Sequence, residues 1–193
     1  MHTARLLIIG TVSALAVGLV AAPASAAPSD GTVVTFDILG GTLDIVSPAD
    51  LSLTPITASA PGTDITAQMG VVAVTDSRAA TDATWAATVT STDFVTPGGL
   101  ASQTIAAALV DYWSGVRLGG GTGNGTFTEA QTLAADAEAL ANAPTAPAVG
   151  LLAFSHTGGS GNNTASWNPT LNVNVPLTSA VGTYTGTVTH SVA

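Results

Sequence analysis

The chain has 193 residues and a formal net charge of −9, with three Lys or Arg residues against twelve acids and no cysteine. Binding to nucleic acid depends on cationic side chains that neutralise phosphates, so this charge balance excludes that class of partner. Without cysteine, the chain has no disulfide bond, no thiolate metal site and no thiol redox chemistry.

The first 26 residues have the pattern of a secretion signal. Arg5 and the amino terminus supply positive charge, an apolar run follows, and Ala24-Ser25-Ala26 is a cleavage site of small residues. A single-pass membrane anchor is the alternative, because the apolar run approaches the roughly 20 residues that a span requires. We therefore predict a signal peptide at 1–26 and one secreted domain at 27–193, with no membrane span after signal removal.

From residue 31 onward, short stretches of alternating apolar and polar residues lie between clusters of Gly, Pro, Asp, Ser and Thr. This period of two, together with abundant threonine, is typical of the strands of an all-β sandwich. Gly40-Gly41 predicts a tight hairpin between the first two strands. We predict an all-β fold, a single antiparallel β-sandwich domain, with strands near residues 33–39, 42–47, 49–53, 70–75, 84–91, 105–112, 149–155, 170–175 and 182–192.

Residues 127–141 interrupt this pattern. Their apolar residues recur at spacings of three and four, and Thr128 with Gln131 has the spacing of a capping box, which predicts a short helix. The glycine-rich residues 119–125 before this segment are instead typical of a flexible loop. The insertion is therefore predicted as a loop or a short helix, and both alternatives stay open.

The last predicted strand, residues 182–192, extends almost to the end of the sequence. Tyr184, Val188 and Val192 lie at even spacings, which places them on one face of a half-buried strand. We expect no sorting tail after this strand. Attachment to a cell would then require a surface of the folded domain.

The residues that catalysis requires are scarce. After the predicted signal peptide, only His156 and His190 could act as a base, and neither lies in a nucleophile motif such as Gly-x-Ser-x-Gly. The chain also has no lysine for a phosphate-binding loop. We therefore predict a protein that is not an enzyme and that uses no cofactor.

Metal binding also finds little support in the sequence. The two histidines are far apart, and neither has a carboxylate at a ligand spacing beside it. Oxygen ligands for calcium could come from Asp76 with Asp82, or from Asn162-Asn163. Because no Asp-x-Asp-x-Asp pattern accompanies them, we interpret these residues as solvated turns and predict no metal site.

The aromatic residues could form a stacking platform for sugars or could fill the core; they include Trp85, Tyr112, Trp113, Trp167 and Tyr184. Trp85 shares a strand face with Ala87 and Val89, which favours the core. Tyr112 and Trp113 are adjacent, so in a strand they point to opposite faces and one of them must approach solvent. Either residue is thus a candidate for ligand contact.

Three segments resemble the WxL domain of Gram-positive surface proteins: Gly70 to Asp76, Asp82 to Val89, and Tyr184 to Val192. That family has one Trp-x-Leu motif in a middle strand and a second near the end of the domain. Trp85 matches the first tryptophan, with Ala87 in place of leucine. At the second motif, His190 stands in place of tryptophan and Val192 in place of leucine.

The resemblance implies an exported, non-enzymatic β-sandwich that associates noncovalently with the peptidoglycan of the cell wall. The alanine-rich composition without lysine suggests an actinobacterial source. Residues expected to contact the wall or a glycan are Trp85, Tyr112, Trp113 and His190. Other protein partners at the cell surface are possible, and two alternatives stay open: a carbohydrate-binding or adhesive module, and a subunit of a surface assembly that adds strands at an exposed edge.

Overall fold

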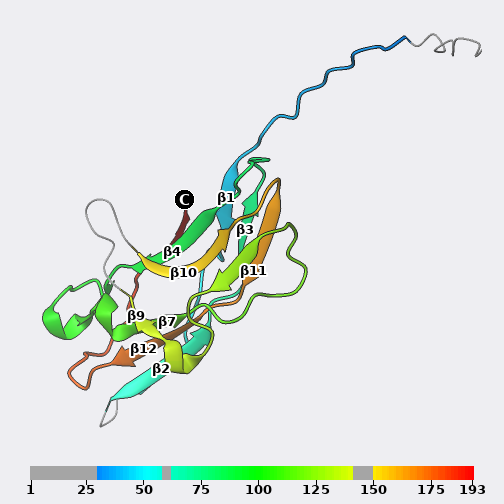
Figure 1. Cartoon of the computed structure of the whole chain (residues 1–193). Coiled ribbons are helices and arrows are strands. Elements are labelled where there is room, and N and C mark those ends of the chain that lie inside the picture. The colour runs from blue at the N-terminus through cyan, green and yellow to red at the C-terminus, as the bar shows by residue number, and fades with distance from the viewer. Residues whose placement is uncertain (1–29, 58–61, 141–149) are drawn as a thin grey trace, which may run out of the picture. The chain divides into compact units, whose positions relative to one another are not determined.

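The computed structural model describes residues 30–57, 62–140 and 150–193. The chain divides into two units, Met1–Phe36 and Asp37–Ala193. In the first unit, the described residues 30–36 have no regular secondary structure. The second unit contains every strand that the structure describes (Figure 1). The predicted signal peptide, and with it the alternative of a membrane anchor, lies outside the described residues.

The regular elements of the second unit are strands and short 3-10 helices. In chain order they are β1 (Leu43–Val46), β2 (Thr63–Gln68), β3 (Val72–Asp76), β4 (Trp85–Ser91), β5 (Phe94–Val95), η1 (Ala101–Gln103), β6 (Thr104–Ile105), η2 (Ala107–Leu109), β7 (Val110–Trp113), β8 (Thr126–Glu129), η3 (Ala134–Asp136), β9 (Glu138–Ala139), β10 (Leu151–Thr157), β11 (Asn163–Trp167), β12 (Thr170–Val175) and β13 (Val188–Val192).

These strands form three larger antiparallel sheets and a small β5-β6 pair. The first sheet has the order β1-β3-β11, and we call it the β3 sheet. The second, β13-β4-β10-β8, is the β4 sheet, and the third, β2-β12-β7-β9, is the β12 sheet. The antiparallel sheets pack together as a sandwich, so the predicted all-β fold class is confirmed.

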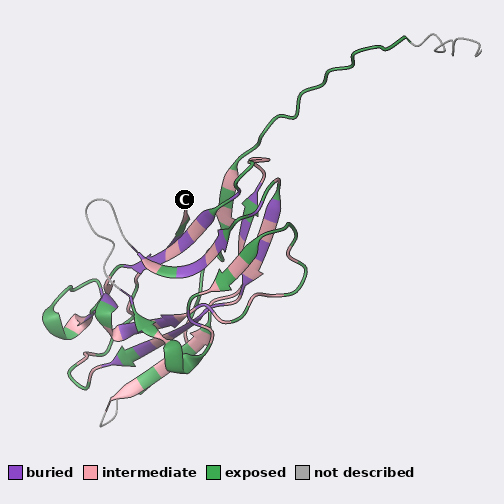
Figure 2. Ribbon diagram, in the orientation of Figure 1, coloured by how far each residue is buried: buried purple, intermediate pink, exposed green. Residues whose placement is uncertain are grey.

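Large apolar side chains from all three sheets form one core. Trp85 and Phe154 come from the β4 sheet, Trp167 from the β3 sheet and Tyr112 from the β12 sheet, and all are buried. Phe154 stacks on Trp167 with ring centroids 4.9 Å apart. Figure 2 shows the buried residues concentrated along the strands, with exposed residues in the turns. Aromatic packing between sheets thus stabilises the sandwich without any disulfide bond.

The predicted hairpin at Gly40-Gly41 is wrong. Residues 33–39 form no strand, and β1 pairs instead with β3, from Leu43 opposite Asp76 to Val46 opposite Ala73. The two glycines serve a close approach of backbones, because a Cβ at Gly41 would lie 2.9 Å from the Cβ of Ser77. The two glycines therefore allow the backbone before β1 to approach the backbone after β3. They do not form the turn of a hairpin.

The helical alternative for the segment 127–141 is wrong, because its described residues, 127–140, form no α-helix. They include most of β8, then η3 and β9 with the residues that connect them, and β8 pairs with β10 through Glu129 opposite Phe154. Pairing with a long neighbouring strand overrides the weak helical preference of an alanine-rich segment. Across residues 30–57, 62–140 and 150–193, no helix has the length and apolarity of a membrane span.

Candidate functional site

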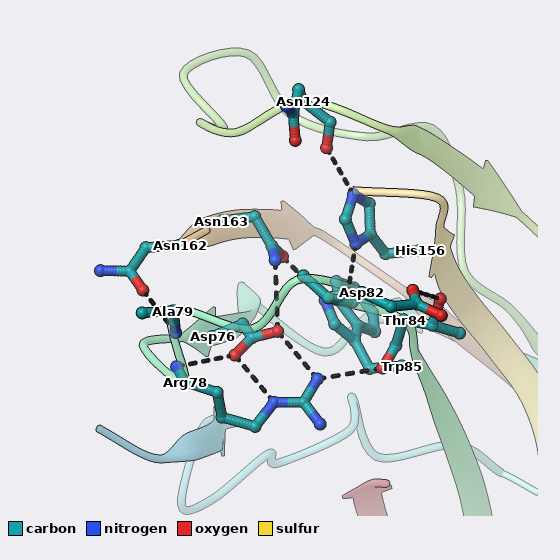
Figure 3. Close-up of polar contacts among 11 residues, drawn as sticks. Asp76, Arg78, Ala79, Asp82, Thr84, Trp85, Asn124, His156, Asn162 and Asn163 are labelled. Atoms are coloured by element: carbon teal, nitrogen blue, oxygen red, sulfur yellow. Dashed lines mark hydrogen bonds and ion pairs between the residues drawn. The ribbon is translucent and has the colours of Figure 1, made fainter. Parts of the chain in front are cut away.

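Trp85 lies in the interior, in a hydrogen-bonded chain that links two sheets (Figure 3). Its indole Nε1 donates to Oδ1 of Asn163 at 2.8 Å, and Nδ2 of Asn163 donates to Oδ2 of Asp76 at 3.2 Å. The Arg78 guanidinium donates to both carboxylate oxygens of Asp76, at 2.9 and 2.8 Å. Trp85 begins β4, whereas Asn163 and Asp76 are opposite one another in the β3 sheet. The cluster therefore fastens the β4 sheet to the β3 sheet.

The charge of this cluster is balanced within it. Hydrogen bonds from Arg78 hold the pKa of the Asp76 carboxyl below its ordinary value, against the opposing effect of burial. The Arg78 side chain is partly exposed, while that of Asp76 is fully buried. A buried carboxylate with a bidentate arginine partner keeps its charge and needs no further ligand. The arrangement is typical of a structural ion pair.

The oxygens that the sequence offers to calcium already accept hydrogen bonds. Both carboxylate oxygens of Asp76 do so, Asp82 accepts from the Thr84 hydroxyl, and Asn162 Oδ1 accepts from the backbone N–H of Ala79 at 3.0 Å. Ala79 has a φ of +52°, a left-handed conformation that non-glycine residues rarely adopt. In the described ranges, no group of three or more His, Cys, Asp or Glu residues is placed to hold a metal ion. The interpretation as solvated turns is therefore wrong for Asp76 and Asn163, which are buried residues of β3 and β11, whereas Asp82 and Asn162 are exposed and lie outside the strands.

Tyr112 and His190 meet in a second buried cluster, beside Trp167. Trp167 Nε1 donates to the Tyr112 hydroxyl at 3.2 Å, and that hydroxyl lies 3.2 Å from Nε2 of His190. A hydroxyl has one donor hydrogen and two acceptor lone pairs, so the direction of the contact between the Tyr112 hydroxyl and Nε2 depends on the imidazole tautomer. Burial raises the pKa of Tyr112 and lowers that of His190 to about 4. Among the described residues, His190 Nδ1 has no hydrogen-bond partner.

His156 anchors the glycine-rich segment before β8 to the sandwich. Its Nδ1 lies 2.7 Å from the Ala83 carbonyl oxygen and its Nε2 lies 2.7 Å from that of Asn124 (Figure 3). His156 is fully buried, and it holds two chain segments together by their backbones.

We expect Gly159→Ala to lower the free energy of unfolding by about 1–3 kcal/mol, the cost of overpacking a tight site. A Cβ at Gly159 would clash with Cε1 of His156 and would lie 2.7 Å from the Asn124 carbonyl oxygen. Gly119→Ala is the matched control, because its Cβ would meet no atom within 4 Å. Urea unfolding followed by tryptophan fluorescence measures both. Equal stabilities of the two variants would show that His156 does not fix this segment.

Trp113 is the one predicted contact residue whose ring is partly open to solvent in this structure. It lines a depression of about 420 Å³ on the β12 sheet, together with Asp64, Thr66, Asp111 and Asn172. Asn172 is opposite Asp111 on one side and Thr66 on the other, and the Thr66 hydroxyl donates to Asn172 Oδ1 at 2.8 Å. We call this surface the Trp113 face. It combines one aromatic ring with two carboxylates, an amide and a hydroxyl.

A second hollow is a groove of about 810 Å³ between residues 51–57 and residues 179–186. Its floor carries apolar side chains of the sandwich, among them Ile65, Ile105, Val173 and Val175. None of the residues that line it is charged. Tyr184 lines one wall, and its hydroxyl lies 2.7 Å from the Ala180 carbonyl oxygen. We call this hollow the apolar groove.

The four residues that the sequence predicted as contacts therefore differ in their exposure to solvent. Trp85 and Tyr112 are 2% and 0% exposed and His190 is buried, so none of these three presents a ring face to an external polymer, and the expectation of surface contact is corrected for them. Trp167, another member of the possible stacking platform, is also in the core. Of the four predicted contact residues, Trp113 alone is part-exposed, and Tyr184 of the possible platform is part-exposed as well.

The sequence analysis missed the polar residues around Trp113. Asp64, Asp111 and Asn172 come from three strands that are distant in sequence, and they meet only through the register of β2, β12 and β7. Alternation around Trp113 places Asp111 on the same strand face, which is the one signal the sequence contained. The chain matches no protein-family model, no curated protein and no solved structure.

Proposed function

We propose that the protein is exported and non-enzymatic, and that it associates noncovalently with cell-wall peptidoglycan through the Trp113 face. The single observation that carries this proposal is the part-exposed Trp113 ring beside Asp64, Asp111 and Asn172. An aromatic face packs on the apolar face of a sugar ring, while carboxylate and amide groups accept and donate hydrogen bonds at its hydroxyl and acetamido groups. The resemblance to WxL domains supports peptidoglycan as the polymer.

The cluster around Trp85 supports the proposal indirectly. It joins two of the resembling segments, at Asp76 and at Trp85, through the Asn163 amide. This gives the first tryptophan of the resemblance a structural role in the sandwich. Wall contact is then left to a surface elsewhere on the domain, and the Trp113 face has the chemistry for it.

Retention on insoluble peptidoglycan tests the proposal. We expect the wild-type domain to sediment with the polymer at moderate salt, and Trp113→Ala to weaken this retention by at least about tenfold, since truncation of one aromatic contact costs above 1 kcal/mol at binding hot spots. Val46→Ala is the control, because Val46 is an exposed apolar residue of the β3 sheet. Sedimentation measures all three proteins across a range of polymer concentrations.

Two outcomes would contradict the proposal in different ways. Wild-type protein that stays in the supernatant would overturn wall binding itself. Trp113→Ala that sediments as well as the wild type would retain wall binding but reject the Trp113 face.

The Trp113 face also has the chemistry to bind a glycan from outside the cell, which is the second candidate function. Its ring and carboxylates are no more specific for peptidoglycan than for another polysaccharide. A panel of insoluble polysaccharides, used beside peptidoglycan with the same Trp113→Ala variant, separates the two. Tryptophan-dependent retention on another polysaccharide but not on peptidoglycan would favour the adhesive module.

A further inference from the structure

The segment 32–39 has the sequence pattern of a strand but no strand partner among the described residues. Val34, Phe36 and Ile38 alternate with Val33, Thr35, Asp37 and Leu39, so an extended chain would present the first three on one face. The large apolar side chains of this segment are 78–89% exposed. Such a run of exposed apolar residues is unusual for a soluble protein, and it marks an interaction surface.

The apolar groove has the complementary surface. Its floor includes Ile105, Val173 and Val175, which belong to the buried core, and half-buried Ile65 and Phe94 surround them. Residues 184–186 belong to the lining of this groove. A strand laid along the groove would place alternate side chains on the apolar floor.

Residues 184–186, which line the groove, have backbone groups available to pair with another strand. Val95 exchanges both backbone hydrogen bonds with Thr185, and the N–H of Thr92 bonds to the Thr187 carbonyl oxygen. Alternate residues of an antiparallel pair point their N–H and C=O groups to opposite edges, so Tyr184 and Gly186 point theirs away from these partners. The described part of the chain pairs no strand with that edge. Free edge groups of this kind are the template for strand addition.

The charges favour this contact over other contacts between copies. With a net charge of −9, two copies repel one another over most of their surfaces. Segment 32–39 carries only Asp37, on the face opposite Phe36, and the groove lining carries no charged residue. The segment and the groove are thus a pair of surfaces that can meet without bringing two carboxylates together.

We propose that residues 32–39 of one copy add as a strand at the edge formed by residues 184–186 of a second copy, with Val34, Phe36 and Ile38 in the apolar groove. Each copy has one such segment and one groove, and the two surfaces differ. The contact is therefore heterologous, and repetition builds a chain of subunits unless the assembly closes into a ring. This assembly does not depend on wall binding through the Trp113 face.

Paired charge substitutions test the segment. In the chain from residue 27 onward, Phe36→Asp is expected to raise the dissociation constant for self-association at least about tenfold, because a buried phenyl ring is lost and a carboxylate would enter an apolar groove. Thr35→Asp adds the same charge to the opposite face and is expected to change the constant much less. Multi-angle light scattering over a concentration series measures both variants, and their thermal unfolding should match that of the wild type. A monomeric wild type at all concentrations, or equal effects of the two variants, would overturn the proposal.

Cysteine trapping separates a contact between copies from one within a copy. The chain has no native cysteine, so Thr35→Cys and Thr183→Cys give unambiguous products. Mixing the two single variants under mild oxidation is expected to produce a disulfide-linked heterodimer, and a peptide of residues 31–40 should reduce its yield. No heterodimer from the mixture, or a double variant that closes only an internal disulfide on dilution, would overturn the proposal.

Discussion

Replacing Trp85 with alanine is expected to lower the free energy of unfolding by about 3–5 kcal/mol, the range for removal of a buried aromatic side chain. The Trp85 ring packs against Phe154 at 6.2 Å between centroids and against His156 at 5.8 Å. Its N–H also satisfies Asn163 Oδ1, which is buried. The variant would leave both a cavity and an unpaired acceptor at the junction of two sheets. Urea unfolding followed by circular dichroism measures the change.

Two further variants distinguish the effect of the cavity from the effect of the unpaired acceptor. Trp85→Phe keeps most of the ring packing but removes the N–H, so we expect a smaller loss of about 1–3 kcal/mol from the unpaired acceptor. Trp113→Ala removes the same kind of side chain from a part-exposed position and should cost less than Trp85→Ala. If Trp85→Ala and Trp113→Ala unfold at the same urea concentration, the sheet-fastening role of Trp85 is wrong.

The same variants distinguish effects on the stability of the fold from effects on peptidoglycan binding. Trp85→Phe is expected to retain peptidoglycan binding, because the Trp113 face lies on a different sheet from Trp85. Trp113→Ala is expected to show the reverse, with a stable fold and weak retention. The resemblance placed Trp85 among the wall contacts on the basis of its motif alone. Because Trp85 is buried, the tryptophan of such a motif can serve core packing in place of wall contact.

Alternation in the sequence was enough to predict the fold class, and several strands were located well, although residues 33–39 and 49–53 form no strand. Residues 84–91 and 170–175 correspond closely to β4 and β12. Strand β11 was missed because its buried face carries Asn163, Ala165 and Trp167, and only the last of these gives a strong apolar signal. Its buried asparagine is explained by bonds to Trp85 and Asp76, which are partners that no local pattern reveals.

The candidate site was predictable only in part, for the same reason. The pairing of β2 and β7 with β12 places Thr66 and Asp111 on the two sides of Asn172, with Asp64 opposite Asn174, and register over such sequence separations is set by tertiary packing. Segment 33–39 shows the opposite case. Its local pattern predicts a strand by the rules of alternation, but that prediction is wrong for the described fold, in which these residues have no pairing partner.

His190 is expected to make the protein less stable in mild acid. Burial lowers its pKa to about 4 from an ordinary value of 6.5. Below about pH 6.5 the unfolded chain takes up a proton that the folded protein does not, so the unfolded state is favoured increasingly as the pH falls toward 4. At about 1.4 kcal/mol for each pKa unit, this gap corresponds to about 3 kcal/mol of stability, present at neutral pH and lost by pH 4.

The surroundings of His190 explain why protonation would be unfavourable there. Its neighbours in the cluster are the Tyr112 hydroxyl, held neutral because burial raises its pKa, and the Trp167 ring, so no carboxylate in the cluster compensates an imidazolium charge. An imidazolium would also need an acceptor at each nitrogen, and Nδ1 has none among the described residues. The cost of the charge therefore stays uncompensated in the folded state.

His190→Leu isolates this effect, because leucine is apolar and does not titrate. We expect the loss of stability between about pH 7 and pH 4 to be smaller in the variant by about 3 kcal/mol, whatever the stability of each protein at neutral pH. Asp76, whose pKa is also lowered in the fold, contributes acid sensitivity equally to both proteins and cancels in the comparison. Urea unfolding at several pH values in this range measures the difference. Parallel pH profiles for the two proteins would mean that His190 is already protonated in the native state, or that it opens to solvent before the fold is lost.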